Sequence, residues 1–239
     1  MTGTELTEPQ HEVLPIAAAT ATSLGHIALH HRPGEGALAA RFFQLLGARV
    51  KAFARPPMEP LYIISLDSVD PDRADDIVFL FGLKPQQIAF ENAIAERFGL
   101  GTDTPDPLLA EFLAERARMP ESYLHFGLHF AELEQLEDAV LRLQEEMAAD
   151  PAFGARIQNF QLLKARGEEG DDAIAERIAA SPVFGDVDQF AYGRHGVQVH
   201  ISTDLFATGL HLLGSVVELD FVFTGPGRVR TAFNTVIPD

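Results

Sequence analysis

Two short stretches, one in each half of the chain, decide the fold. Leu24–His31 reads "LGHIALHH" and Tyr123–Phe130 reads "YLHFGLHF". Each stretch has a histidine in third place and another four residues later, with small or apolar residues between them. Side chains of a β-strand alternate between its two faces, so both histidines of a stretch lie on the same face. We interpret the stretches as corresponding strands of a duplicated module.

The segments that follow each stretch come in the same order. A helical pattern ending at Gly47 follows the first stretch, and a longer amphipathic pattern follows the second. Three strand-like runs then follow each helix. Because an internal repeat indicates the fold more strongly than any single motif, we predict an α+β chain with two βαβββ modules. The predicted helices span 37–47 and 131–149, and the predicted strands span 48–56, 60–68, 75–84, 155–164, 197–203 and 214–223.

The repeat divides the chain into five segments. The stretch between the two modules carries its own apolar helical face, which is typical of an inserted linker. A charged stretch, 165–185, is a further insertion inside the second module. The segments are an N-terminal extension (1–22), the first module (23–84), a helical linker (85–120), the second module (121–225) and a C-terminal tail (226–239).

Composition limits the chemistry of any site. The chain has 239 residues, which is long enough to bury a core. It has no cysteine, which excludes disulfides, thiol nucleophiles and iron–sulfur clusters. A bound metal must therefore be held by histidine, aspartate or glutamate, and nine histidines are present.

Charge and hydropathy limit the partners. Lysine and arginine number 18 against 35 acidic residues, giving a net charge of −17. Nucleic acids and anionic membranes attract basic surfaces, so we expect neither as a partner. No apolar run is long enough for a transmembrane helix, and the N-terminus does not resemble a secretory signal. We expect a cytoplasmic protein that acts on a small molecule.

Two histidine faces and one carboxylate make the candidate site. His26 and His30 flank Ala28 on one face, and His125 and His129 flank Gly127 on another, so each face leaves room for a ligand. Glu218 stands in an apolar strand and shares its face with Val216 and Asp220. A buried carboxylate is costly unless a cation or a strong hydrogen-bond donor accompanies it. Glu218 therefore needs such a partner.

These landmarks resemble the vicinal oxygen chelate superfamily. The duplicated βαβββ order carries the resemblance, with "GHIAL" (25–29) opening one module, "LHFGL" (124–128) opening the next and "VEL" (217–219) in the last strand. The superfamily includes glyoxalase I, methylmalonyl-CoA epimerase, extradiol dioxygenases and bleomycin resistance proteins. The resemblance implies that the two modules form a cup-shaped, barrel-like mixed sheet with helical insertions. The modules can pair within one chain or across a homodimer.

The resemblance also implies a metal site. Carried over position by position, it makes His26, His125 and Glu218 the ligands of one divalent metal. The fourth ligand position of the family falls on Phe79 or a neighbour, where no ligand stands. Two histidines and one carboxylate with open positions are typical of non-heme Fe(II) oxygenases, so Fe(II) is favoured, with Mn, Ni or Zn as alternatives.

Three further histidines are candidate acid–base groups. The resemblance places His200 where ring-cleaving dioxygenases have an acid–base histidine, and His30 and His129 lie one step beyond the predicted ligands. A cavity-rim or core role is the alternative for each. We predict a dioxygenase-like oxidoreductase acting on a substrate chelated through vicinal oxygens. The alternatives are a glyoxalase- or epimerase-type lyase or isomerase, a non-catalytic binding protein, and a purely structural hydrogen-bonded cluster.

Overall fold

Each half of the chain folds as a strand, a helix and three strands, as predicted. The computed structural model describes residues 25–66, 76–165, 172–191 and 195–223, so the predicted extension and tail lie outside it. The first module contains β1 (His26–His31), α1 (Gly36–Leu45), β2 (Arg49–Arg55), β3 (Met58–Ser65) and β4 (Ile77–Gly82). The second contains β5 (His125–His129), α4 (Leu133–Ala149), β6 (Ile157–Leu163), β7 (Gly196–Thr203) and β8 (Ser215–Val222).

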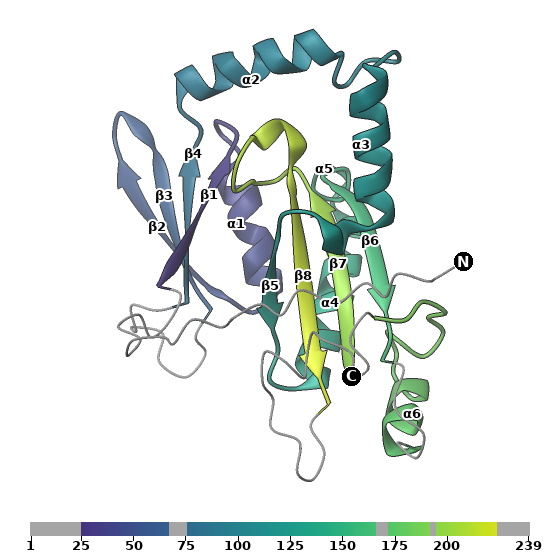
Figure 1. The fold of residues 1–239 in the computed structure, drawn as a ribbon. Helices are drawn as coiled ribbons and strands as arrows, with labels where there is room; N and C mark the ends of the chain where they lie inside the picture. The colour runs from purple at the N-terminus through teal and green to yellow at the C-terminus, as the bar shows by residue number, and fades with distance from the viewer. Residues whose placement is uncertain (1–24, 67–75, 166–171, 192–194, 224–239) are drawn as a thin grey trace, which may run out of the picture.

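The two sheets have the same topology. Their strand orders are β1-β4-β3-β2 and β5-β8-β7-β6, with the first and last strands of each module parallel and the other pairs antiparallel. Figure 1 shows the sheets side by side, with α4 behind the second. The α+β class and the duplicated modules are confirmed. The sheets remain separate and do not close into a barrel, so the expected cup is not confirmed.

The linker is helical, as predicted. It contains α2 (Pro85–Phe98) and α3 (Pro107–Arg118), each starting with proline, whose fixed φ suits a first helical position. Gly99 ends α2 at φ 63°, and the Asp106 side chain accepts from the Leu108 N–H at the start of α3. In Figure 1, α2 runs across the ends of the strands and α3 descends beside the second module.

Four short helices complete the described elements. They are α5 (Pro151–Gly154), α6 (Asp172–Ala179) and two 3₁₀ turns, η1 (Pro120–Ser122) and η2 (His211–Leu213). In the described part of the chain, no helix combines the length and apolar character needed to cross a bilayer.

A cluster of phenylalanine side chains joins the two modules in the core. Phe206, which follows β7, is fully buried. Its ring centroid lies 5.3 Å from that of Phe42 and 5.0 Å from that of Phe43, both on α1. It lies 6.3 Å from that of Phe126 on β5. Phe206 therefore packs at once on the helix of one module and a strand of the other.

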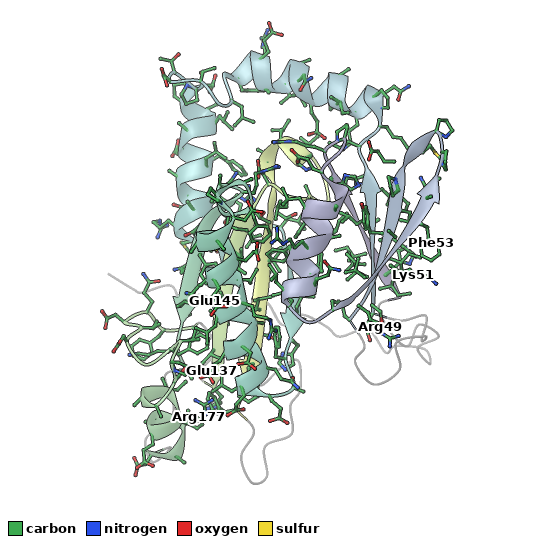
Figure 2. The ribbon with its side chains drawn as sticks, turned by 180° about the vertical axis from the view of Figure 1, so that it is seen from behind. Arg49, Lys51, Phe53, Glu137, Glu145 and Arg177 are labelled. Carbon is green, nitrogen blue, oxygen red and sulfur yellow. The ribbon has the colours of Figure 1, made fainter. Side chains whose placement is uncertain are left out.

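An ion pair between a buried glutamate and a half-buried arginine holds α6 against α4. Arg177 donates to both carboxylate oxygens of Glu137, at 3.1 and 2.7 Å, and Figure 2 shows the two side chains meeting. The Ser181 hydroxyl also donates to Glu137, whose side chain is 7% exposed. Removing one partner of a buried pair leaves the other charge uncompensated.

We expect Arg177→Met to lower the free energy of unfolding by about 3 kcal/mol in urea denaturation. The Glu137→Leu/Arg177→Met double variant removes both charges and should recover most of this loss. A single variant as stable as the parent protein would contradict the pairing.

Candidate functional site

One face of the second sheet is polar from edge to edge. The register sets His200 opposite Glu218 and Gln198 opposite Asp220, while His129 on β5 pairs with Asp220 from the other side. Paired residues of neighbouring strands point to the same face. The reverse face carries buried apolar residues such as Val199 and Leu219, which pack in the core under α4. We call the following set the polar face: His125, His129, Gln161, Gln198, His200, Glu218 and Asp220.

Glu218 is the centre of the polar face. Its Oε2 lies 3.2 Å from His125 Nε2 and 3.6 Å from His200 Nε2. Its Oε1 accepts a hydrogen bond of 2.6 Å from Gln198 Nε2. The Glu218 side chain is only 12% exposed. As predicted for a buried carboxylate, it has a nitrogen donor at each of its two oxygens.

A backbone carbonyl fixes the orientation of the His125 ring. Its Nδ1 lies 2.7 Å from the Tyr123 carbonyl oxygen, which can only accept, so Nδ1 carries a proton. Nε2 is then the atom that faces Glu218. Hydrogen bonding to Glu218 raises the pKa of His125 above its usual value, against the opposing effect of burial.

The environment keeps Glu218 ionised. Burial by itself would raise its pKa, but the favourable interactions with the His125 and His200 rings outweigh burial and lower the pKa to about 2. His200 is 1% exposed, and neither of its ring nitrogens has a partner within hydrogen-bond distance among the described residues. Glu218 is therefore an anion flanked by two imidazoles, of which His125 is the nearer.

Asp220 behaves in the opposite way. It lies against His129 Nδ1 through Oδ1 on the same face. Burial, and then repulsion from Glu218, raises the pKa of Asp220 to about 7. Two carboxyl groups on one strand face thus differ by several pKa units, an arrangement typical of sites that donate and accept protons near neutral pH.

We expect Asp220→Asn to stabilise the protein at alkaline pH. A carboxyl group whose pKa rises on folding contributes stability that is fully present below its unfolded value, 3.8, and is lost as pH rises through about 7. Asparagine removes that loss and can still accept a hydrogen bond from His129. Thermal denaturation at pH 8 should give a Tm about 2 °C or more above that of the parent, with a smaller difference at pH 5. A variant less stable than the parent at pH 8 would show that the Asp220 anion is stabilising.

Cavities lie on both sides of the polar face. One of about 350 Å³ is lined by His200, Gln198 and Gln161, with Gln189 and Arg118 opposite them. A larger one, of about 640 Å³, lies beyond β5 and includes Gly127 and His129 in its wall. A Cβ added at Gly127 would meet nothing within 4 Å, as expected for a small residue beside open space. A small polar molecule therefore has room beside His200 and Gln198, two neighbours of Glu218 that line the smaller cavity.

His26 does not join this cluster. It lies on β1 in the first sheet, with its ring 5.1 Å from that of Phe79. Among the described residues, no hydrogen bond or ion pair connects it to His125 or Glu218. Ala28 pairs with Phe79 as Gly127 pairs with Glu218, so Phe79 is the counterpart of Glu218 in the first module.

The other predicted acid–base residues are divided between the sheets. His129 and His200 belong to the polar face, whereas His30 lies on β1, pairs with Ala207 and has its ring 6.1 Å from that of Phe81. Burial, followed by the nearby His31, lowers the pKa of His30. Gln198 and Asp220 had no predicted role, although each lies two residues from a predicted site residue, His200 and Glu218, and so shares its face.

The predicted metal ligands are only partly brought together. His125 and Glu218, two of the three predicted ligands, come together, but His26 is not joined to them. In the ranges that the structure describes, no group of three or more histidine, aspartate and glutamate side chains is arranged to hold a metal ion. The predicted triad stays a prediction.

Comparisons with known proteins add no family. No protein-family model matches the chain, and no curated protein matches it. Among solved structures it is similar to one described as "Structure of hypothetical protein SA1046 from S. aureus", at 11% identity and a TM-score of 0.36, over 85% of this chain and 95% of that chain. A similarity this low carries no argument, so the resemblance to the vicinal oxygen chelate superfamily also stays a prediction.

Proposed function

We propose that this chain is an enzyme that transfers a proton on a small polar substrate bound at the polar face. One observation carries the proposal: Glu218 Oε2 is shared between His125 Nε2 and His200 Nε2, beside a cavity of about 350 Å³. Histidines held by a carboxylate are common general acids and bases. The reaction class is removal of a proton next to a carbonyl group, as in an isomerase, epimerase or lyase.

Each residue has a distinct part in this chemistry. His200 lines the cavity, and both of its ring nitrogens are buried without a hydrogen-bond partner among the described residues, so a rotation of the ring toward the cavity lets it take the proton from the substrate carbon. The hydrogen bond to Glu218 raises the pKa of His125, so this ring can carry a positive charge on the polar face, and that charge stabilises the negative charge that develops on the carbonyl oxygen as the proton leaves. Gln198 donates a hydrogen bond to the other carboxylate oxygen, Oε1, and so orients the Glu218 side chain. His129 and Asp220 lie on the same face, two residues beyond Gly127 and Glu218, and can return a proton to the product.

Solvent exchange tests the proposal over a panel of small substrates. Small 2-oxo acids, hydroxyketones and 2-hydroxy acids are incubated with the protein in D₂O, and proton NMR follows the signal next to the carbonyl or hydroxyl group. Enzyme-dependent loss of that signal for at least one compound class is the expected result. Saturable binding without exchange across the panel would favour a non-catalytic binding protein and overturn the proposal.

An iron-dependent dioxygenase is the second candidate, and one observation favours it. His125 and Glu218 lie 3.2 Å apart, and the other nitrogen of His125 is bonded to a backbone carbonyl, as is usual for metal-bound imidazoles. Because His26 is not brought to them, the residues fit a three-ligand metal site incompletely. The resemblance to the vicinal oxygen chelate superfamily also underlies the proposal that the two modules form one cup-shaped sheet.

Metal content separates the two candidates. Plasma mass spectrometry on protein purified without oxygen should find no stoichiometric metal if the acid–base cluster acts alone. Stoichiometric iron would support the dioxygenase, and stoichiometric nickel, zinc or manganese would support a metal-assisted isomerase or lyase.

A further inference from the structure

A third cavity, in the helical linker, is lined only by apolar residues. It has a volume of about 260 Å³ and lies between α2, α3 and the turn that contains η2. Several of its side chains are exposed, and Leu108 is 75% exposed. Its lining is Ile94, Ala95, Phe98, Leu100, Leu108, Leu109, Phe112, Leu210, Leu212 and Leu213.

A half-buried arginine lies at the border of this apolar cavity. Arg116 stands one helical turn after Phe112 on α3, so the two side chains share a helix face. Its Nη1 donates to the carbonyl oxygen of Leu213, another residue of the lining. Burial lowers the pKa of Arg116, and among the described residues no carboxylate pairs with it.

Of the other half-buried arginines in the described residues, Arg41, Arg156 and Arg177 are paired with carboxylates, whereas Arg55 is not. Arg156 binds Asp204 and Glu35, and Arg177 binds Glu137. The chain has almost twice as many acidic as basic residues, so a partner for Arg116 would be easy to supply. A guanidinium without a counter-ion beside apolar surface is suited to an external anion that carries an apolar group.

We propose that this apolar cavity binds a monocarboxylate with an alkyl chain, such as a medium-chain fatty acid. The carboxylate pairs with Arg116, and the chain fills the cavity between α2 and α3. A liquid water molecule occupies about 30 Å³, so 260 Å³ holds about nine groups of that size, which matches a chain of about eight to ten carbons. The site does not depend on the proposed enzyme activity.

Calorimetric titration of the full chain with octanoate and octan-1-ol tests both halves of the proposal. The two probes have the same chain and differ in the head group, and both are used below their micellar concentrations. Octanoate should bind at one site, about tenfold or more tightly than octanol, because a hydrogen-bonded charge pair contributes that much. Each methylene added between hexanoate and decanoate should tighten binding about fourfold until the cavity is full.

Three variants show which residues bind the head group and the alkyl chain of the probes. Arg116→Gln should bind octanol as the parent does and lose the preference for octanoate. Arg97→Gln, the same change at an exposed position on α2, should leave both affinities unchanged. Ala95→Phe should weaken both probes by filling the cavity.

Octanol binding by Arg116→Gln, with an unchanged circular dichroism spectrum, shows that the variant is folded. Equal affinity of the parent for octanoate and octanol, a retained preference in Arg116→Gln, or no saturable binding of either probe would overturn the proposal.

Discussion

Glu218→Gln is expected to slow proton exchange on the responsive substrate by about 10²–10⁴-fold, the range that positioned general acid–base catalysis contributes. Glutamine keeps the size of the side chain and an oxygen that can accept from Gln198, but it removes the negative charge. The hydrogen bond to the Glu218 carboxylate, with the negative charge adding to it, raises the pKa of His125. Without the carboxylate, the pKa of His125 falls and the ring carries less of the positive charge that stabilises the substrate oxygen.

The pH profile of the variant distinguishes this role from a purely structural one. The parent rate should fall on the alkaline side as His125 deprotonates, and in Glu218→Gln this fall should move to lower pH. Glu145→Gln is the matched control, since Glu145 lies on α4, on the opposite side of the second sheet from the polar face (Figure 2). A Glu218→Gln enzyme with parent-like rate and profile would remove Glu218 from the chemistry.

Phe206→Ala is expected to lower the free energy of unfolding by about 3–5 kcal/mol. The ring is fully buried and contacts α1 and β5 at the same time, so its removal leaves a cavity between two modules that cannot both close over it. Urea denaturation followed by circular dichroism measures the change.

Phe53→Ala is the matched control for this loss. Phe53 lies on the edge strand β2, is 38% exposed, and sits under the Lys51 ammonium (Figure 2). Its removal should cost less than about 1 kcal/mol, since exposed contacts of this kind contribute about that much. Similar losses in both variants would mean that Phe206 does not join the modules.

The duplicated modules could be predicted from the sequence because they follow from local patterns. Alternation on "LHFGL" sets His125 and His129 on one face, and the apolar run around Glu218 indicates a buried strand whose carboxylate needs a donor. Both expectations agree with the structure, which gives Glu218 two imidazoles and an amide. The same alternation also places Asp220 and Gln198 correctly once their strands are known.

Which histidines reach Glu218 could not be predicted in the same way. The pairing of His200 with Glu218 depends on the register across the turn between β7 and β8, and a shift by one residue would turn His200 to the other face. His26 has a suitable position in its own module, but alternation within a strand says nothing about the distance between two sheets. The position of Arg116 beside the apolar cavity likewise depends on how α3 packs against η2, which no local sequence pattern predicts.

The imidazole pKa of His125 tests the central claim most directly. Nitrogen-detected NMR of the metal-free protein follows the ring across pH 4 to 10, with the His125→Asn spectrum providing the assignment. The shared-carboxylate arrangement predicts a pKa above the usual histidine value of 6.5 in the parent protein, and a fall toward that value in Glu218→Gln. A pKa at or below 6.5 in the parent, unchanged by Glu218→Gln, would contradict the proposed acid–base site.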